Sequence, residues 1–448
     1  MNYIEEVRKL VAGKKAYVRT YGCQLNENDG EKIIAMLKAM GYLITDNAEE
    51  ADFALLNTCA IRENAEKKTY GAIGVFKHYK ELNPGLVVAM SGCMTGEEHV
   101  IESLRKTYRH VDVVFGANNI EAFPRLLFLH LTEARRVFDT EYDDSVPPAN
   151  LPTARAFPFK SGVPVMYGCN NFCTYCIVPY VRGRERSRDE ADIINEIKAL
   201  RDDGCKEVML LGQNVNSFGG GGDAFANLLK KVSDTGIERI RFMTSHPKDL
   251  SPAVLEVMAE RENICKCLHL PVQSGNNRVL ESMNRRYTRE KYLSIVKLAR
   301  EKMPGLSITT DIIVGFPGET NEEFVDTLSL LEEVRFDAIF SFIYSPRRGT
   351  PAEKMPDVLS VEEKKANFEK LLEVQNRISG EINETYLGKT VSVLCEGVSK
   401  TDAGNMSGRT EGGKIVNFPG SQDMIGKILE VKITETKTWN LQGEAVCR

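Results

Sequence analysis

The sequence predicts an α/β protein that holds two successive series of strand–helix units and a small C-terminal β-barrel. Apolar, strand-like runs alternate with helix-like stretches before residue 130 and again between residues 164 and 343, which is the pattern of largely parallel sheets. From residue 388 the pattern changes to short β-rich runs separated by Gly and Asp turns, as in small barrels. A chain of 448 residues has room for two or three such domains.

The first series predicts an open parallel sheet in which each of the first three strands leads to a cysteine. These cysteines are Cys23, Cys59 and Cys93. Because parallel strands end along one edge of a sheet, thiols that are distant in sequence can converge there. The alternative is three buried structural cysteines, but Gly22 and Gly92 directly before two of them favour an iron–sulfur site. The expected strands and helices are, in order, 15–20, 29–40, 51–57, 62–80, 86–91, 98–107 and 111–115.

A proline-rich stretch that opens with acidic residues, 143–158, is expected to be an exposed linker. Beyond it, helix-like stretches separate a second set of strands, and a long charged helix at 361–386 leads to the last domain. In such βα series the functional residues lie after the carboxyl ends of the strands. The expected strands are 164–167, 207–211, 239–243, 267–270, 307–313 and 337–343.

Cys169, Cys173 and Cys176 form a C-x3-C-x2-C triplet just after the first strand of this second set. Three thiolates on one loop suit a [4Fe-4S] cluster whose fourth iron stays open for a ligand. A structural zinc site would need a fourth ligand, and no further cysteine or histidine lies close by in the sequence. The spacing therefore predicts a cluster. The remaining cysteines, expected to pack as small apolar residues, are Cys205, Cys265, Cys267, Cys395 and Cys447.

The segment 165–176 resembles the radical S-adenosylmethionine (SAM) superfamily. That resemblance implies a partial (β/α)6 barrel, SAM chelated by the open iron, and reductive cleavage of SAM to a 5′-deoxyadenosyl radical. Tyr175 occupies the aromatic position before the last cysteine and is expected in the cofactor site. Weaker candidates for SAM contacts are Gln213, Gln273 and Asp311, each of which could equally be an ordinary polar loop residue.

The segments 20–29, 56–65 and 91–94 resemble the methylthiotransferase family, and 168–188 resembles the branch of it that modifies tRNA. The resemblance implies an auxiliary [4Fe-4S] cluster on the first three cysteines. It also implies domains at 14–130 (methylthiotransferase N-terminal domain), 155–385 (radical SAM core) and 386–448 (TRAM RNA-binding domain).

The activity that this resemblance implies is methylthiolation of C2 of N6-isopentenyladenosine next to the anticodon. One SAM would methylate a sulfur held on the auxiliary cluster, and a second would give the radical that removes the C2 hydrogen. The implied partners are a tRNA anticodon stem-loop, an electron donor and a sulfur source.

Two other functions stay open. A sibling enzyme would act on threonylcarbamoyl-adenosine in tRNA or on a ribosomal-protein aspartate, against which Asn170, Asn171 and segment 180–186 count by resemblance. A non-catalytic RNA-binding iron–sulfur protein would hold clusters without turning over SAM.

Charge and composition restrict how RNA could bind. The net charge of -5 argues against nonspecific coating of nucleic acid, so RNA contacts must be local. The segment 182–188 carries four arginines, which could neutralise phosphates or form salt bridges at a solvated helix start. In the last domain, phosphate contacts and base stacking could come from Arg409, Lys414, Phe418 and Trp439 if exposed, although the two aromatic residues could instead fill the barrel.

The chain is 42% hydrophobic and 27% charged, without an apolar run of about 18 residues that could cross a membrane. The N-terminus lacks the basic-then-apolar order of a signal peptide. We therefore expect a cytoplasmic protein without a membrane partner, and a monomer.

Overall fold

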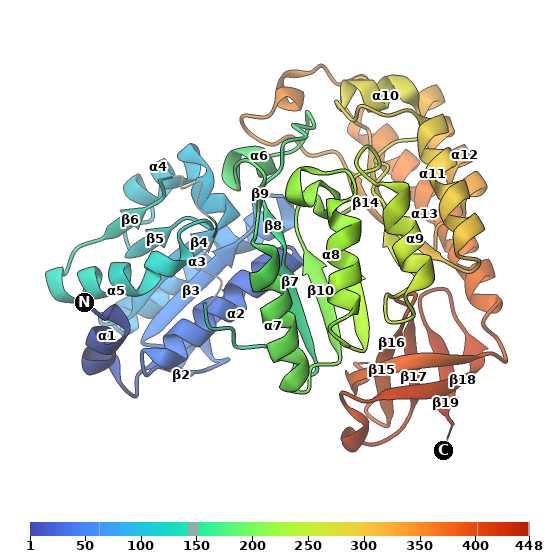
Figure 1. The fold of residues 1–448 in the computed structure, drawn as a ribbon. Helices are drawn as coiled ribbons and strands as arrows, with labels where there is room; N and C mark the ends of the chain where they lie inside the picture. Colours follow the sequence, from blue (N-terminus) through green and yellow to red (C-terminus); the bar gives the residue numbers. More distant parts are fainter. Residues whose placement is uncertain (62, 142–145, 147–150, 401, 447–448) are drawn as a thin grey trace.

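Three regions follow one another along the chain: a parallel α/β sheet, a partial barrel and a small closed barrel (Figure 1). The computed structural model describes residues 1–61, 63–141, 146, 151–400 and 402–446. The α/β class and this three-part architecture are those predicted from the sequence. Much of the expected linker at 143–158 lies outside the described residues.

The N-terminal sheet places the ends of three neighbouring strands side by side. Its strands are all parallel, in the order β2-β1-β3-β4-β5-β6. Thr20 pairs with Asn57, and Thr58 pairs with Gly92, so β1, β3 and β4 end level. The central β3 and β4 are buried at every position, as expected of parallel strands covered on both faces. The strands are β1 (Lys15–Thr20), β2 (Leu43–Ile44), β3 (Phe53–Thr58), β4 (Val87–Gly92), β5 (Val113–Phe115) and β6 (Val137–Asp139).

One helix of this region starts earlier than predicted. Helix α2 begins at Gln24, directly after Cys23, and not at residue 29. The polar residue Asn26 lies before the predicted start at Asp29, but both residues are buried and hydrogen-bonded within the structure. The helices here are α1 (Tyr3–Val11), α2 (Gln24–Ala39), α3 (Glu63–Leu82), α4 (Glu98–Lys106) and α5 (Phe123–Glu133).

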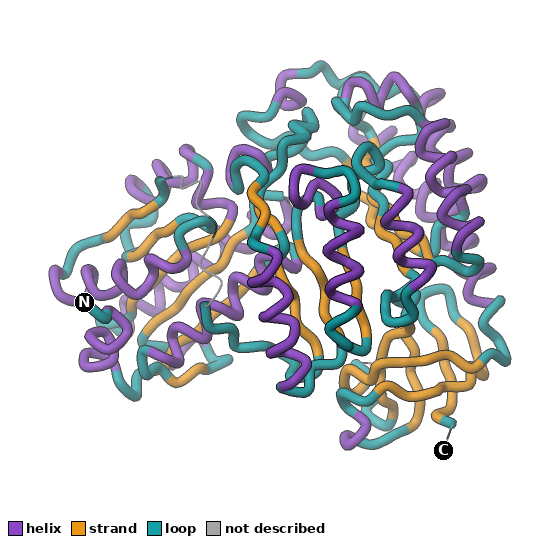
Figure 2. The backbone as a smooth tube through the Cα atoms, viewed as in Figure 1, coloured by secondary structure: helices purple, strands orange, loops and turns teal. Residues whose placement is uncertain are grey.

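The partial barrel consists of two parallel sheets, β11-β10-β7 and β12-β13-β14, joined by a bridge between Ile240 and Ile264. Helices cover its outer face (Figure 2). Its strands are β7 (Lys160–Pro164), β10 (Glu207–Leu211), β11 (Arg239–Phe242), β12 (Cys267–His269), β13 (Ser307–Val314) and β14 (Ala338–Ile343), and its main helices are α7 (Glu190–Asp202), α8 (Ala224–Ser233), α9 (Pro252–Glu260), α10 (Asn277–Ser282), α11 (Arg289–Lys302) and α12 (Asn321–Val334).

The predicted position of the first barrel strand, 164–167, was wrong. The strand that joins the barrel is β7, and Met166–Tyr167 (β8) pairs antiparallel with Arg186–Ser187 (β9) outside it. The apolar run continues from one strand into the other, so the sequence pattern alone does not separate them.

The C-terminal barrel is closed in the order β15-β16-β17-β19-β18. Helix α13 (Val361–Glu384) leads into it, close to the predicted helix at 361–386. Arg241 of β11 donates to the backbone oxygens of Thr410 (2.7 Å) and Glu411 (2.8 Å) and pairs with Glu207 (2.9 Å). This barrel therefore docks at the amino ends of the β10 and β11 strands. Its strands are β15 (Thr390–Val398), β16 (Asn405–Thr410), β17 (Ile415–Pro419), β18 (Ile428–Thr436) and β19 (Leu441–Ala445).

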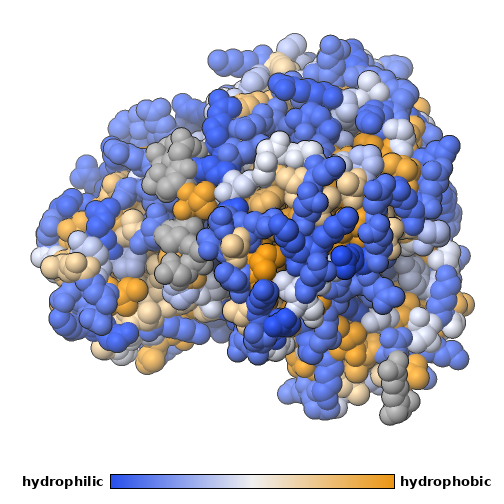
Figure 3. Space-filling model, viewed as in Figure 1, coloured by the Kyte–Doolittle hydropathy of each residue, from blue (hydrophilic) through white to orange (hydrophobic). Residues whose placement is uncertain are grey.

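The surface seen in Figure 3 is mostly hydrophilic, with hydrophobic residues in separate small groups. Among the described residues, no helix has the length and apolar character needed to cross a bilayer.

Candidate iron–sulfur sites

The structure brings Cys23, Cys59 and Cys93 together at the carboxyl ends of β1, β3 and β4. A β-carbon added to Gly22 would lie 2.9 Å from the sulfur of Cys59, so the backbone before Cys23 abuts that thiol. Burial raises the pKa of the Cys93 thiol to about 11, and negative charge on Cys59 and Cys23 adds to the rise. We call these three residues the auxiliary triad.

Glycines allow the strand ends of the auxiliary triad to approach. Gly22 and Gly92 have φ values of +114° and +97°, which side chains rarely adopt. A β-carbon on Gly92 would overlap the backbone oxygen of Thr58 and lie 2.5 Å from its nitrogen. The two glycines that the sequence singled out are therefore required by backbone geometry.

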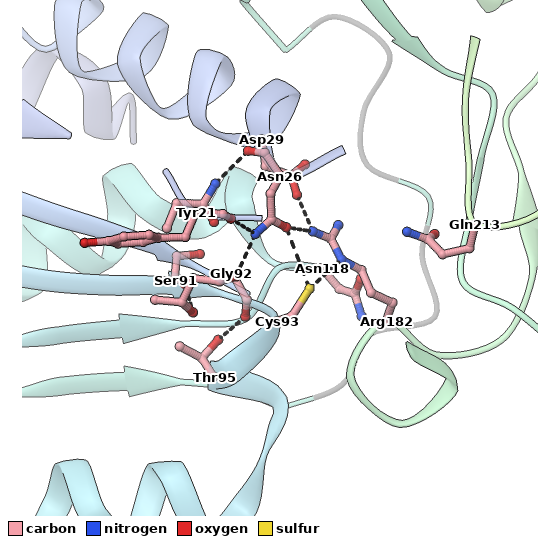
Figure 4. A network of polar contacts seen from close by, with 12 residues as sticks. Tyr21, Asn26, Asp29, Ser91, Gly92, Cys93, Thr95, Asn118, Arg182 and Gln213 are labelled. Atoms are coloured by element: carbon pink, nitrogen blue, oxygen red, sulfur yellow. Dashed lines mark hydrogen bonds and ion pairs between the residues drawn. The ribbon is translucent and has the colours of Figure 1, made fainter. Parts of the chain in front are cut away.

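Asn26, in the first turn of α2, forms hydrogen bonds with residues at the same strand ends. Its amide donates to the backbone oxygens of Tyr21 (2.8 Å) and Thr58 (2.7 Å), and its backbone oxygen accepts from the Asn57 amide (2.7 Å). Asn26 is fully buried. Figure 4 shows its side chain between the strand ends and Cys93.

Arg182 enters this network from the partial barrel. Its Nε donates to the sulfur of Cys93 (3.2 Å), and its Nη2 donates to Asp29 (2.7 Å) and to the Asn26 side-chain oxygen. The side chain is 1% exposed. Arg182 therefore lies beside a thiol and is closed to solvent. Of the two roles expected for segment 182–188, this arginine has the salt bridge and cannot reach an RNA phosphate.

The other arginines of segment 182–188 differ in exposure. Arg188 is buried, where it donates to the backbone oxygen of Pro164 (2.7 Å) and pairs with Glu196 (2.7 Å). Arg184 is exposed and lies over the Phe172 ring (4.4 Å to the centroid). The predicted basic patch is thus smaller than its sequence suggests.

The triplet Cys169, Cys173 and Cys176 forms a second group of neighbouring thiols. Burial raises the pKa of the Cys169 thiol to about 11 and also raises that of Cys176, with negative charge on the neighbouring thiols adding to both. Gly168 has φ +73°, and a β-carbon there would lie 2.5 Å from the backbone carbon of Arg184. The loop that holds these thiols, which we call the barrel triad, is therefore tightly folded.

The segment 282–285 supports the barrel triad from across the barrel. The Asn284 amide donates to the backbone oxygens of Asn171 (3.2 Å) and Phe172 (3.0 Å). The backbone nitrogen of Thr174 donates to the Met283 oxygen (3.1 Å). No spacing or motif in the sequence connected this segment to the triplet.

Arg285 in that segment contacts the barrel triad directly. Its Nη1 donates to the sulfur of Cys173 (3.3 Å) and to the Tyr175 hydroxyl (3.5 Å). It also donates to the Tyr287 hydroxyl (3.0 Å) and the Pro271 oxygen (2.7 Å), and it is 4% exposed. Burial raises the pKa of the Tyr175 hydroxyl well above its ordinary value, so that hydroxyl stays protonated.

Of the other SAM-contact candidates, Gln213 and Gln273 follow β10 and β12, whereas Asp311 lies within β13. The Gln213 side-chain oxygen accepts from the backbone nitrogen of Gly168 (3.1 Å), which places it against the barrel triad. Gln273, with φ +74°, bonds through its backbone to Asp311 (2.9 Å). Asp311 lies 3.5 Å from the imidazole of His269.

The cysteines outside the triads pack as expected where they are described. Cys205, Cys265 and Cys395 are buried, and Cys267 is half-buried. Cys447 lies outside the described residues.

Both triads fit a [4Fe-4S] cluster. Each offers three thiols and one buried arginine that donates to a thiol sulfur, which suits anionic thiolates. In a cluster each cysteine binds a different iron, so the sulfurs need not converge on one point. In the described part of the chain, no group of three or more His, Cys, Asp or Glu residues is arranged around a single metal ion.

Three family models match the chain. They are described as Radical SAM superfamily (residues 163–331), Uncharacterized protein family UPF0004 (15–116) and TRAM domain (384–446). Among curated relatives named tRNA-2-methylthio-N(6)-dimethylallyladenosine synthase, that of Acetivibrio thermocellus is 51% identical over 100% of this chain and 94% of the relative. That of Alkaliphilus oremlandii is 49% identical over 99% and 95%.

A solved structure supports the fold. The radical S-adenosylmethionine methyltransferase TsrM from Kitasatospora setae, with tryptophan and a SAM analogue bound, superposes with a TM-score of 0.54 at 14% identity. The match covers 85% of this chain and 78% of that one. At this identity the likeness concerns the fold alone.

Proposed function

The chain belongs to the tRNA-2-methylthio-N(6)-dimethylallyladenosine synthase family, and we propose that it methylthiolates C2 of N6-isopentenyladenosine next to the anticodon of tRNA. It is a radical SAM methylthiotransferase, with SAM and [4Fe-4S] clusters as cofactors. The observation that carries the proposal is the presence of two cysteine triads in adjoining domains, each made of buried and half-buried cysteines. One triad alone would serve SAM cleavage without a separate place for sulfur.

In this proposal the two triads hold two different clusters. When bound, the clusters supply reductive SAM cleavage at one site and a sulfur-carrying open iron at the other. The auxiliary triad binds the sulfur-carrying cluster, and the barrel triad binds the SAM-cleaving one. Tyr175, Gln213, Gln273 and Asp311 contact SAM. The domains are 14–130, 155–385 and 386–448.

The position of the C-terminal barrel favours a long substrate. It docks at the amino ends of barrel strands, whereas the barrel triad follows their carboxyl ends. A ligand that touches both must extend along the protein, as tRNA can. Trp439 is 62% exposed and is available for base stacking.

Two of the RNA contacts expected in this barrel are unavailable. Phe418 fills the barrel core, and Lys414 is tied to Asp337 (3.1 Å) with both side chains 10% exposed. Arg409 faces Glu396 (3.4 Å), which offsets part of its charge. We place the enzyme in the cytoplasm as a monomer that takes electrons from a donor and sulfur from a separate source.

The proposal is tested by incubating the anaerobically reconstituted protein with SAM, reductant and isopentenylated tRNA from cells that lack the gene. We expect 2-methylthio-N6-isopentenyladenosine among the digested nucleosides by mass spectrometry. 5′-Deoxyadenosine without that nucleoside would redirect the assay to the sibling substrates. Absence of 5′-deoxyadenosine, with both clusters loaded, would leave the non-catalytic RNA-binding function.

A further inference from the structure

Arg182 belongs to the partial barrel by sequence but bonds to the N-terminal domain. It directly follows helix α6 (Val178–Val181), which begins just after Cys176. Its guanidinium contacts Cys93, Asn26 and Asp29, all from the N-terminal domain (Figure 4). Arg182 is thus the end of a short segment that starts at one triad and finishes at the other.

Packing fixes that segment in place. Ile177 and Val181 are buried in the same hydrophobic core as Cys59 and Cys93. A β-carbon on Gly96, just beyond Cys93, would lie 3.0 Å from Val181, so these two segments of the chain are in close contact. The segment 176–182 therefore has little freedom to move relative to the auxiliary triad.

The Arg182 guanidinium contacts two groups that can carry negative charge. Nε faces the Cys93 sulfur and Nη2 faces the Asp29 carboxylate. The Arg182 and Asp29 side chains are 1% and 3% exposed, so water screens neither contact appreciably. Hydrogen bonds and positive charge at a cysteine ligand raise the reduction potential of an iron–sulfur cluster, and Asp29 opposes that effect.

We propose that Arg182 is a positioning residue that holds the Cys93 side of the auxiliary cluster in fixed relation to the barrel triad and raises that cluster's reduction potential. The inference rests on the proposed function, because it assigns a cluster to the auxiliary triad. It gives a segment that resembled an RNA-binding stretch a role between the two sites.

The test measures the midpoint potential of the auxiliary cluster alone, by potentiometric electron paramagnetic resonance. The background carries Cys169→Ala, Cys173→Ala and Cys176→Ala. Asp29→Asn leaves the arginine facing the thiolate without its competing anion, so the potential should rise. Arg182→Met combined with Asp29→Asn removes both charges together with the bond to sulfur, so the potential should fall below that of the background. The potential of Arg182→Lys should lie between that of Asp29→Asn and that of the double variant.

A matched control is Arg188→Met combined with Glu196→Gln. It removes another ion pair, between the buried Arg188 and the half-buried Glu196, in which the guanidinium contacts the Glu196 carboxylate and the Pro164 oxygen and not a thiol, and it should leave the potential unchanged. If Arg182 and Asp29 had only a structural role, the midpoint potentials of Asp29→Asn and of the double variant would shift in the same direction or not at all. Either result overturns the inference. If the double variant does not fold, absence of a rise in Asp29→Asn overturns it.

The two proposals fail in different ways. Iron and sulfide assays on the background protein show whether the auxiliary triad binds a cluster at all. An empty auxiliary triad contradicts the proposed function. A loaded triad whose potential ignores Asp29 and Arg182 contradicts the inference alone.

Discussion

The auxiliary triad and the barrel triad reach similar surroundings by different routes. The barrel triad lies on one loop, whereas Cys23, Cys59 and Cys93 come from separate strand ends that meet only because β1, β3 and β4 end level. In both, a left-handed glycine precedes a cysteine, as Gly92 and Gly168 do. Both triads therefore include a glycine with positive φ directly before a cysteine, whatever the spacing of their cysteines.

The supports differ in where they come from. Asn26 and Asn284 each clamp two backbone oxygens beside a triad. Arg285, which contacts Cys173, belongs to the same domain as the barrel triad. Arg182, which contacts Cys93, comes from the neighbouring domain. The auxiliary triad is therefore completed only when the two domains are docked.

Loss of either triad should give the largest and most distinct effects. Cys169→Ala should abolish 5′-deoxyadenosine formation, because that triad would hold the cluster that cleaves SAM. Cys23→Ala should keep SAM cleavage but stop methylthiolation. Cys205→Ala removes a buried cysteine outside both triads and should change neither product. Methylthiolation by the Cys23 variant would remove that residue from the auxiliary site.

Substituting the glycines should damage one triad at a time. Gly92→Ala drives a β-carbon into Thr58 and should empty the auxiliary triad, while Gly168→Ala drives one into Arg184 and should empty the barrel triad. The iron content of each triad, measured with the other removed, reports the effect.

Gly13 and Gly204 provide matched controls for this comparison. Both have φ +83°, and an added β-carbon would meet nothing within 4 Å. Alanine there should cost only the left-handed strain of about 1–2 kcal/mol and spare both clusters. Full iron in the Gly92 variant would show that strand convergence is not needed.

The two asparagine clamps should differ in strength. Asn26→Ala leaves two backbone oxygens and the Arg182 guanidinium short of a partner in a buried place, at a cost of about 3 kcal/mol. Asn284→Gly keeps the left-handed φ of +58° and loses two part-buried bonds, at about 1–2 kcal/mol. Urea unfolding measures both, and equal costs would contradict the difference in burial.

A buried carboxyl should give the barrel a pH response that the auxiliary triad does not share. Burial raises the pKa of Glu319 to about 7, although the Gly315 and Phe316 amides oppose the rise. The stabilisation by its protonated form is complete below the ordinary value of 4.5 and is lost as pH rises through about 7, which amounts to at most about 3 kcal/mol.

Glu319→Gln should therefore flatten the loss of barrel stability between pH 5 and pH 8 in urea unfolding. Glu322→Gln, at an exposed glutamate in the next helix, is the control and should follow the wild type. Iron bound by the auxiliary triad should not change in either variant. A parallel pH slope in wild type and Glu319→Gln would show that this carboxyl is not responsible.

Sequence periodicity was sufficient for most strands and helices around the triads and for the residues that carry the thiols, although it missed α1, β2, α5 and β6. Strand and helix patterns depend on local alternation of apolar side chains, and the triplet spacing is local as well. The predicted start of α2 was too late because it left out Asn26, a polar residue whose hydrogen-bond partners are buried backbone oxygens. From the sequence, a polar side chain indicates a loop, because the pattern does not tell whether that side chain bonds to water or to buried protein groups.

By itself the sequence determined the α/β class, the β-rich last domain, the cysteine sets and the glycines before them, since each depends on neighbouring residues. Only the tertiary structure decided that Arg182 faces Cys93 while Arg184 is exposed, that Arg285 reaches Cys173, and that Phe418 fills the barrel while Trp439 does not. Those outcomes depend on which distant elements pack together, and a side chain's partners across domains leave no periodic trace in the chain.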